Sequence, residues 1–148
     1  MKTRILPLLM VTLICLISCY EQPLPDGKPT REQFVSTVKS FPYTAPEERK
    51  SVLIENYVKL SEGMSKQQVT AILGDPDYSD TTASKTFWGM RPHGSQWFYC
   101  VYCVSKYVGT DGRDRVIEVI FDLDGKARWI VPRGIEGLTE KGAPWRSD

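Results

Sequence analysis

The stretch Leu60–Asp77, with the sequence LSEGMSKQQVTAILGDPD, decides how this chain folds. Ser65 and Gln68 have the spacing of a capping box, in which each side chain bonds a free backbone N–H of the first helical turn. Apolar residues then recur at helical spacing, at Val69, Ile72 and Leu73. Gly74 permits a left-handed stop, and a proline follows two residues later. We therefore predict a helix over residues 65–73 with one apolar face.

A longer helix is predicted just before this stretch, over residues 45–60. The segment Thr44–Glu47 offers a threonine cap, a first-turn proline and an acidic third position. Apolar residues again return at helical spacing, at Val52, Leu53, Tyr57 and Leu60. Farther upstream, Thr30 and Gln33 match a second capping box, which predicts a short helix within residues 30–39.

Strand patterns replace helical ones after residue 76. The expected strands are Lys85–Gly89, Gln96–Val108, Arg115–Leu123 and Ala127–Val131. On the third of these, alternation places Ile117, Val119 and Phe121 on one face. Short turns join successive strands, so the sheet is expected to be an antiparallel meander whose apolar face the helices cover. The predicted fold class is α+β, with two layers: two helices packed on a three- to four-stranded antiparallel sheet over residues 44–131.

Several motifs in this region resemble the SmpA/OmlA (BamE-like) family of outer-membrane lipoproteins. The family pattern is Gly-Met-Ser/Thr, a short helix with a central valine, and Leu-Gly-x-Pro, which residues 60–69 and 72–77 match. An aromatic strand, Trp97–Tyr99, and a hairpin of the Phe-Asp-x-x-Gly type, Phe121–Lys126, extend the resemblance over about residues 57–131. The resemblance implies a non-enzymatic protein that works in outer-membrane assembly. Residues 30–42, Cys100, Cys103 and the tail are not part of the family pattern.

The N-terminus has the pattern of a lipoprotein signal peptide. Basic residues at Lys2 and Arg4 precede an apolar run that is shorter than the ~20 residues a membrane-spanning helix needs. The run ends in Leu16-Ile17-Ser18-Cys19, which resembles the bacterial lipobox. We expect cleavage after residue 18 and acylation of Cys19, with palmitate among the acyl chains. An ordinary secretory signal is the simpler alternative.

Processing would change the length and the formal charge of the chain. The precursor has 148 residues and a formal charge of +1; without residues 1–18 it has 130 residues and, having lost two basic residues, a charge of −1. Acyl chains would anchor it to the membrane. Tyr20 after the cysteine, rather than aspartate, favours the outer membrane. Residues 19–43 are then a lipidated, proline-rich tether with a short helix, and residues 132–148 an extended tail.

The pair Cys100 and Cys103 has the spacing of a redox motif, but the surrounding residues form strands. A redox-active pair needs its first thiol at a helix N-terminus, where the dipole lowers the pKa. Residues three apart in an extended strand are separated by ~10 Å, beyond the ~7 Å between Cα atoms that a disulfide spans. A disulfide would therefore require a bulge or turn. In an oxidising periplasm the two cysteines stay a candidate disulfide, which we favour over redox catalysis.

Other chemistry finds little support in the sequence. His93 is the only histidine, which excludes a multi-histidine metal centre, and its surroundings predict an exposed loop. Asp122–Gly125 resembles part of a calcium loop but lies between strands, so a hairpin turn is favoured. We expect no catalytic residues, no metal and no cofactor. The near-neutral charge argues against a nucleic-acid partner.

Aromatic residues crowd around the first two expected strands. We predict a partner surface on Trp88, Trp97, Tyr99 and Tyr102, because aromatic residues are enriched at interfaces. The expected function is that of a periplasmic lipoprotein anchored in the outer membrane, a protein-binding or scaffolding module in outer-membrane assembly or envelope maintenance. The alternative is an inhibitor or immunity lipoprotein that binds a periplasmic hydrolase such as a lysozyme, with Trp88–His93 as its contact loop.

Overall fold

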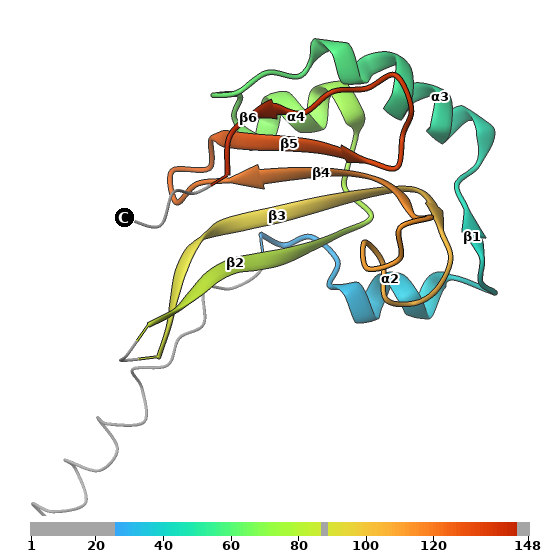
Figure 1. The fold of residues 1–148 in the computed structure, drawn as a ribbon, viewed down its shortest axis with the longest axis horizontal. Coiled ribbons are helices and arrows are strands. Elements are labelled where there is room, and N and C mark those ends of the chain that lie inside the picture. Colours follow the sequence, from blue (N-terminus) through green and yellow to red (C-terminus); the bar gives the residue numbers. More distant parts are fainter. Residues whose placement is uncertain (1–25, 87–88, 145–148) are drawn as a thin grey trace, which may run out of the picture.

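One antiparallel sheet organises the molecule, with helices on both of its faces (Figure 1). The computed structural model describes residues 26–86 and 89–144. The elements in chain order are α2 (Arg31–Thr37), β1 (Tyr43–Thr44), α3 (Glu47–Asn56), the 3₁₀ helix η1 (Tyr57–Lys59), α4 (Lys66–Leu73), β2 (Tyr78–Thr86), β3 (Gly89–Cys103), β4 (Arg115–Phe121), β5 (Ala127–Arg133) and β6 (Lys141–Gly142).

The long strand β3 is the axis of the sheet. It pairs along one edge with β4, and along the other edge first with β2 and then with the short β1. Beyond β4 the order continues through β5 to β6, so the sheet has six strands. The α+β class was predicted correctly, but three to four strands was too few. The sequence indicated neither the two-residue strands β1 and β6 nor the true extent of β2.

A first core lies between the sheet and the pair α3 and α4. Leu53 of α3 and Leu73 of α4 are fully buried against it. The sheet contributes alternating residues, among them Trp97, Tyr99, Ile117, Val119 and Phe121. The predicted alternation along β4 is therefore confirmed, and the helices pack on the sheet as expected.

A second core lies on the opposite face, under α2. Phe34 is the buried residue of this helix, and its ring lies 5.8 Å from that of Tyr78, which stacks at 4.3 Å on Phe98. Cys100, Cys103, Val108 and Val116 complete the cluster. Helices thus cover both faces, and the two-layer prediction is corrected: α2 adds a third layer because Phe34 has an apolar strand face to bury. The division of the chain into tether, domain and tail stays a prediction.

The helix caps follow the sequence closely, with one exception. Thr30 and Ser65 each form the predicted capping box, with Gln33 and Gln68. The exception is α3, whose N-cap is Pro46 without a side-chain hydrogen bond. Thr44 does not cap this helix, because it lies in β1, paired with Tyr102.

Two strand boundaries differ from the prediction. Lys85–Gly89 is not one strand: β2 runs over Tyr78–Thr86, and Gly89 already belongs to β3. Residues 104–108 lie beyond the end of β3 rather than within it. Among the residues that the structure describes, no helix has the length and apolar character needed to cross a bilayer.

Candidate partner-binding surface

The turn after α4, residues Leu73–Asp77, is held from several sides. The Arg49 guanidinium donates from α3 to the carbonyl oxygens of Leu73 at 2.7 Å and Asp75 at 2.6 Å. It also lies over the ring of Tyr99, 5.5 Å from the centroid. Two carbonyls at the end of a helix, which have no partner within it, are thereby satisfied. The sequence motif therefore forms a turn between α4 and β2 that Arg49 holds in place.

Asp77 connects this turn to β3 through hydrogen bonds. Its carboxylate accepts from the backbone N–H of Cys100 at 2.6 Å, and its own N–H donates to Phe98 at 2.9 Å. Burial raises the pKa of Asp77, against the opposing effects of the Cys100 hydrogen bond and the charge of Arg49. The Asp77 carboxylate thus fixes the backbone of β3 beside the turn.

The start of the motif is tied to the sheet as well. The N–H of Gly63 donates to the carbonyl of Ala127, and the N–H of Ala127 to the carbonyl of Met64, both at 2.7 Å. Gly63 has a φ of +85°, a conformation that favours glycine. Both ends of the motif therefore have a structural role in the fold.

The predicted aromatic surface is corrected by the burial of its members. Trp97 is 2% exposed and Tyr99 is fully buried, so neither side chain can contact a partner. Both point into the first core because they alternate on the face that α3 and α4 cover. Tyr102 is half-buried, and Trp88 lies outside the described residues.

The most exposed apolar residues of the helical layer lie instead on α3 and η1. Ile54 is 40% exposed and Val58, one turn later, is 70% exposed. Ile54 lines a groove of about 530 Å³, which we call the α3 groove. It is lined by Glu47, Lys50, Ser51, Ile54, Glu55, Val101, Arg115, Gly134, Ile135 and Glu136. Exposed apolar side chains beside a groove with a charged rim are typical of a protein-binding surface.

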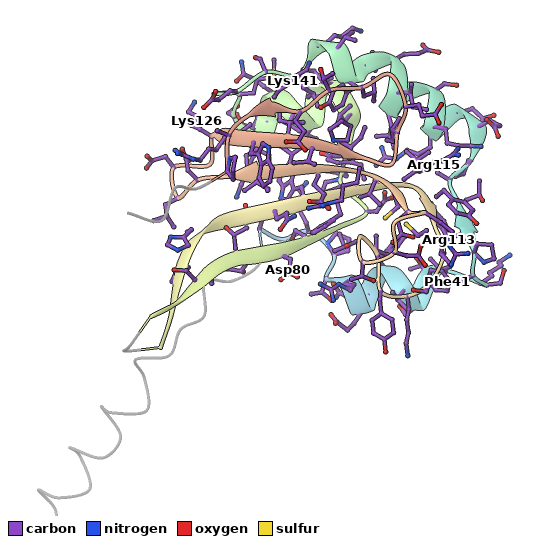
Figure 2. All side chains as sticks on the ribbon, viewed as in Figure 1. Phe41, Asp80, Arg113, Arg115, Lys126 and Lys141 are labelled. Atoms are coloured by element: carbon purple, nitrogen blue, oxygen red, sulfur yellow. The ribbon has the colours of Figure 1, made fainter. Side chains whose placement is uncertain are left out.

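The charges around the α3 groove are mixed in sign. On α3, Lys50 forms an ion pair with Glu47 one turn earlier. Arg115 stands at the sheet end of the groove (Figure 2), and Glu136 lies on the segment after β5. A rim with both signs can orient a partner, with Ile54 and Ile135 as apolar contacts within the groove.

The remaining predicted sites fall into two groups. Cys19 lies outside the described residues. Cys100 and Cys103 are buried free thiols in the second core. Within the described part of the chain, no three His, Cys, Asp or Glu side chains are grouped so that they could hold a metal ion.

Two smaller interpretations can be compared with the geometry. Asp122–Gly125 is a hairpin turn, as favoured: the Asp122 carboxylate accepts from the N–H groups of Asp124 and Lys126. The segment Gly89–His93 is part of β3 and not a loop. His93 there makes a hydrogen bond with Ser84 of β2. The alternative function therefore loses the contact loop on which it was based.

Comparison with known families gives a match over part of the chain. The model of the outer membrane protein assembly factor BamE domain matches residues 51–88. The resemblance inferred from the sequence is confirmed over this segment, which includes most of α3, all of η1, α4 and β2. The match indicates a function related to outer membrane protein assembly. No curated protein and no solved structure matches the chain.

Proposed function

We propose that this protein is a periplasmic lipoprotein, anchored in the outer membrane through Cys19, that binds a protein of the outer-membrane assembly process along the α3 groove. One observation carries the proposal: Ile54, the exposed apolar residue that lines the groove, and Val58, exposed one turn later, lie inside the segment that matches the BamE domain. The lipid would hold the domain at the membrane, and the groove would hold the partner. The proposed role is scaffolding, without catalysis.

The α3 helix offers a matched control for this surface. Val52 and Ile54 are both 40% exposed and belong to the same helix. At 100° per residue they fall on opposite flanks of the buried Leu53, and only Ile54 lines the groove. A difference in partner contacts between the two positions therefore reports on the groove and not on nonspecific hydrophobic binding by the helix.

Crosslinking in intact cells tests the proposal. A photoreactive residue at position 54 or 58 should crosslink to an outer-membrane assembly protein, and the same residue at position 52 should not. Val58→Asp should reduce the crosslinks from position 54 by about tenfold or more, since a charge in an apolar contact costs more than 1.4 kcal/mol. Equal crosslinking from positions 52 and 54, or wild-type levels of outer-membrane barrels after deletion of the protein, would refute the proposal.

A further inference from the structure

Cys100 and Cys103 come together because β3 is irregular at this point. Cys100 pairs with Val116 of β4, but Tyr102 pairs with Arg115, so two steps along β3 match one step along β4. Val101 is the extra residue of a β-bulge. In a regular strand, residues three apart point to opposite faces. Here the bulge reverses the alternation, and both cysteines enter the second core.

The backbone around the pair is fixed at both ends by carboxylates. Asp77 accepts from the N–H of Cys100, as described above, and Asp114 accepts from the N–H of Val104 at 2.8 Å. Asp114 is 2% exposed and accepts from the N–H of Gly109 as well, also at 2.8 Å. The two thiols are within hydrogen-bonding contact of one another. The backbone geometry of the strand, and not only the side-chain rotamers, thus brings the two thiols together.

We propose that Cys100 and Cys103 form a structural disulfide, which closes across the bulge during folding, before α2 covers it. Each thiol loses one hydrogen and a sulfur–sulfur bond forms. The two electrons and two protons reduce the disulfide of a thiol–disulfide oxidant to two thiols. The proposal rests on the proposed export only for its oxidising compartment, and on the bulge for its geometry.

The surroundings of the pair favour a structural bond over redox catalysis. The hydrogen bond with Cys103, burial, and the nearby carboxylates of Asp77 and Asp114 all raise the pKa of Cys100. Since the thiolate is the attacking species, the packed thiols are inert. In the unfolded chain they are accessible and have ordinary pKa values, so oxidation belongs to folding. Once Phe34 packs in the same cluster, the bond is shielded from reductants.

Peptide mapping of the processed protein tests the disulfide directly. The protein is isolated from the cell envelope in acid, unfolded, alkylated without reductant and digested with trypsin. Cleavage after Lys85 and Lys106 leaves both cysteines in one peptide, Thr86–Lys106, because the Arg91–Pro92 bond resists trypsin. We expect this peptide to carry no alkyl group before reduction and one on each cysteine after it. Alkylation of either cysteine before reduction would overturn the proposal for the protein in cells.

Refolding of the reduced protein with glutathione disulfide separates this proposal from that of export. A disulfide that forms on refolding but not in cells would support the bulge geometry and count against the proposed compartment. Free thiols in both cases would refute the geometry itself, with export left as proposed.

The shielding by α2 is tested by the rate at which a phosphine reduces the native oxidised protein. Phe34→Ala should speed reduction by about tenfold or more, since opening of the second core then costs less. Val52→Ala, at a side chain 40% exposed on α3, in the other layer and outside the α3 groove, should leave the rate unchanged. If Phe34→Ala does not fold, Val38→Ala replaces it. Val38 packs against the same cluster, and its truncation removes fewer atoms. Equal rates in all variants would refute the shielding.

Discussion

Arg49 joins α3 to the end of α4 and to the turn after it, and its loss should be costly. In Arg49→Met the side chain keeps its length but no longer donates to the carbonyls of Leu73 and Asp75. We expect the free energy of unfolding in urea to fall by about 2 kcal/mol, since two charge-assisted hydrogen bonds are lost and one carbonyl is partly buried. Lys50→Met is the control, because it removes only an ion pair whose glutamate is largely exposed. Its effect should be below about 1 kcal/mol. Equal losses in both variants would contradict the role of Arg49.

Residue-scale features were predictable where their partners are close in sequence. The capping boxes at Thr30 and Ser65 depend on a spacing of three residues, which is visible in the sequence. The contacts of Arg49 span 24 and 26 residues, so no local pattern indicates them. The exposure of Trp97 was misjudged for a related reason: which face of a strand is buried depends on helices that pack on it, and alternation alone does not say which.

Elements in this sheet approach one another most closely at glycines, and Gly94 is the clearest case. It lies in β3 with a φ of +151°, and a Cβ built there would lie 1.8 Å from the carbonyl oxygen of Phe121 in β4. Gly94→Ala should therefore force the two strands apart and lower the free energy of unfolding by about 3 kcal/mol or more.

Gly112 gives the matched control for this variant. It lies in the turn before β4, has no positive φ, and a Cβ there meets nothing within 4 Å. Gly112→Ala should leave the stability unchanged or raise it by up to about 1 kcal/mol, through the entropy of the unfolded chain. Thermal unfolding of both variants, with hydrogen exchange of the β3 and β4 amides in Gly94→Ala, measures the difference. Normal protection of those amides would contradict the close approach.

At the scale of elements, strong periodic signals gave the right result and weak ones did not. The helix over Lys66–Leu73 and strand β4 carry clear apolar periods and were predicted. Strand β2 is rich in serine and threonine; in its described part most side chains after Ser79 are exposed, so it lacks the apolar alternation that predicts a strand. It is a strand because β3 pairs with it. The same holds for β6, two residues that pair with β5.

The whole molecule is a single sheet with a core on each face. Neighbouring residues of β3 enter different cores, Trp97 and Tyr99 the first, Phe98 and Cys100 the second. Because the same strands form a wall of both cores, opening one removes support from the other. The molecule should therefore unfold as one cooperative unit. Sequence reasoning missed this arrangement because it assigned a single covered face to the sheet.

Two tyrosines, Tyr57 buried in the first core and Tyr43 partly buried beside the second, allow this cooperativity to be measured through pH. Burial raises the pKa of Tyr57, in the first core, and of Tyr43, beside the second, from 10.0 to about 12 in each case. Between these values the unfolded chain loses phenolic protons that the folded protein keeps. The contribution to stability is thus complete below pH 10 and is lost as the pH rises to about 12. Lys141 acts in the opposite sense, since burial lowers its pKa, but its effect ends at the ordinary value of 10.5.

We therefore expect the free energy of unfolding in urea to decline above about pH 10.5, and both tyrosines to contribute to the slope. Tyr57→Phe and Tyr43→Phe should each flatten the decline, and the double variant should flatten it by the sum of the two. Val52→Ala, a change at an exposed apolar residue of α3, should not alter the slope between pH 10.5 and about pH 12. The test of cooperativity uses the protein refolded with both cysteines reduced: thiol exposure in the second core and near-ultraviolet circular dichroism should give the same midpoint at every pH. If the two cores unfold together, Tyr57→Phe should flatten the decline of the free energy of unfolding equally for both probes. A flatter decline with one probe and not with the other would show that the two cores unfold separately.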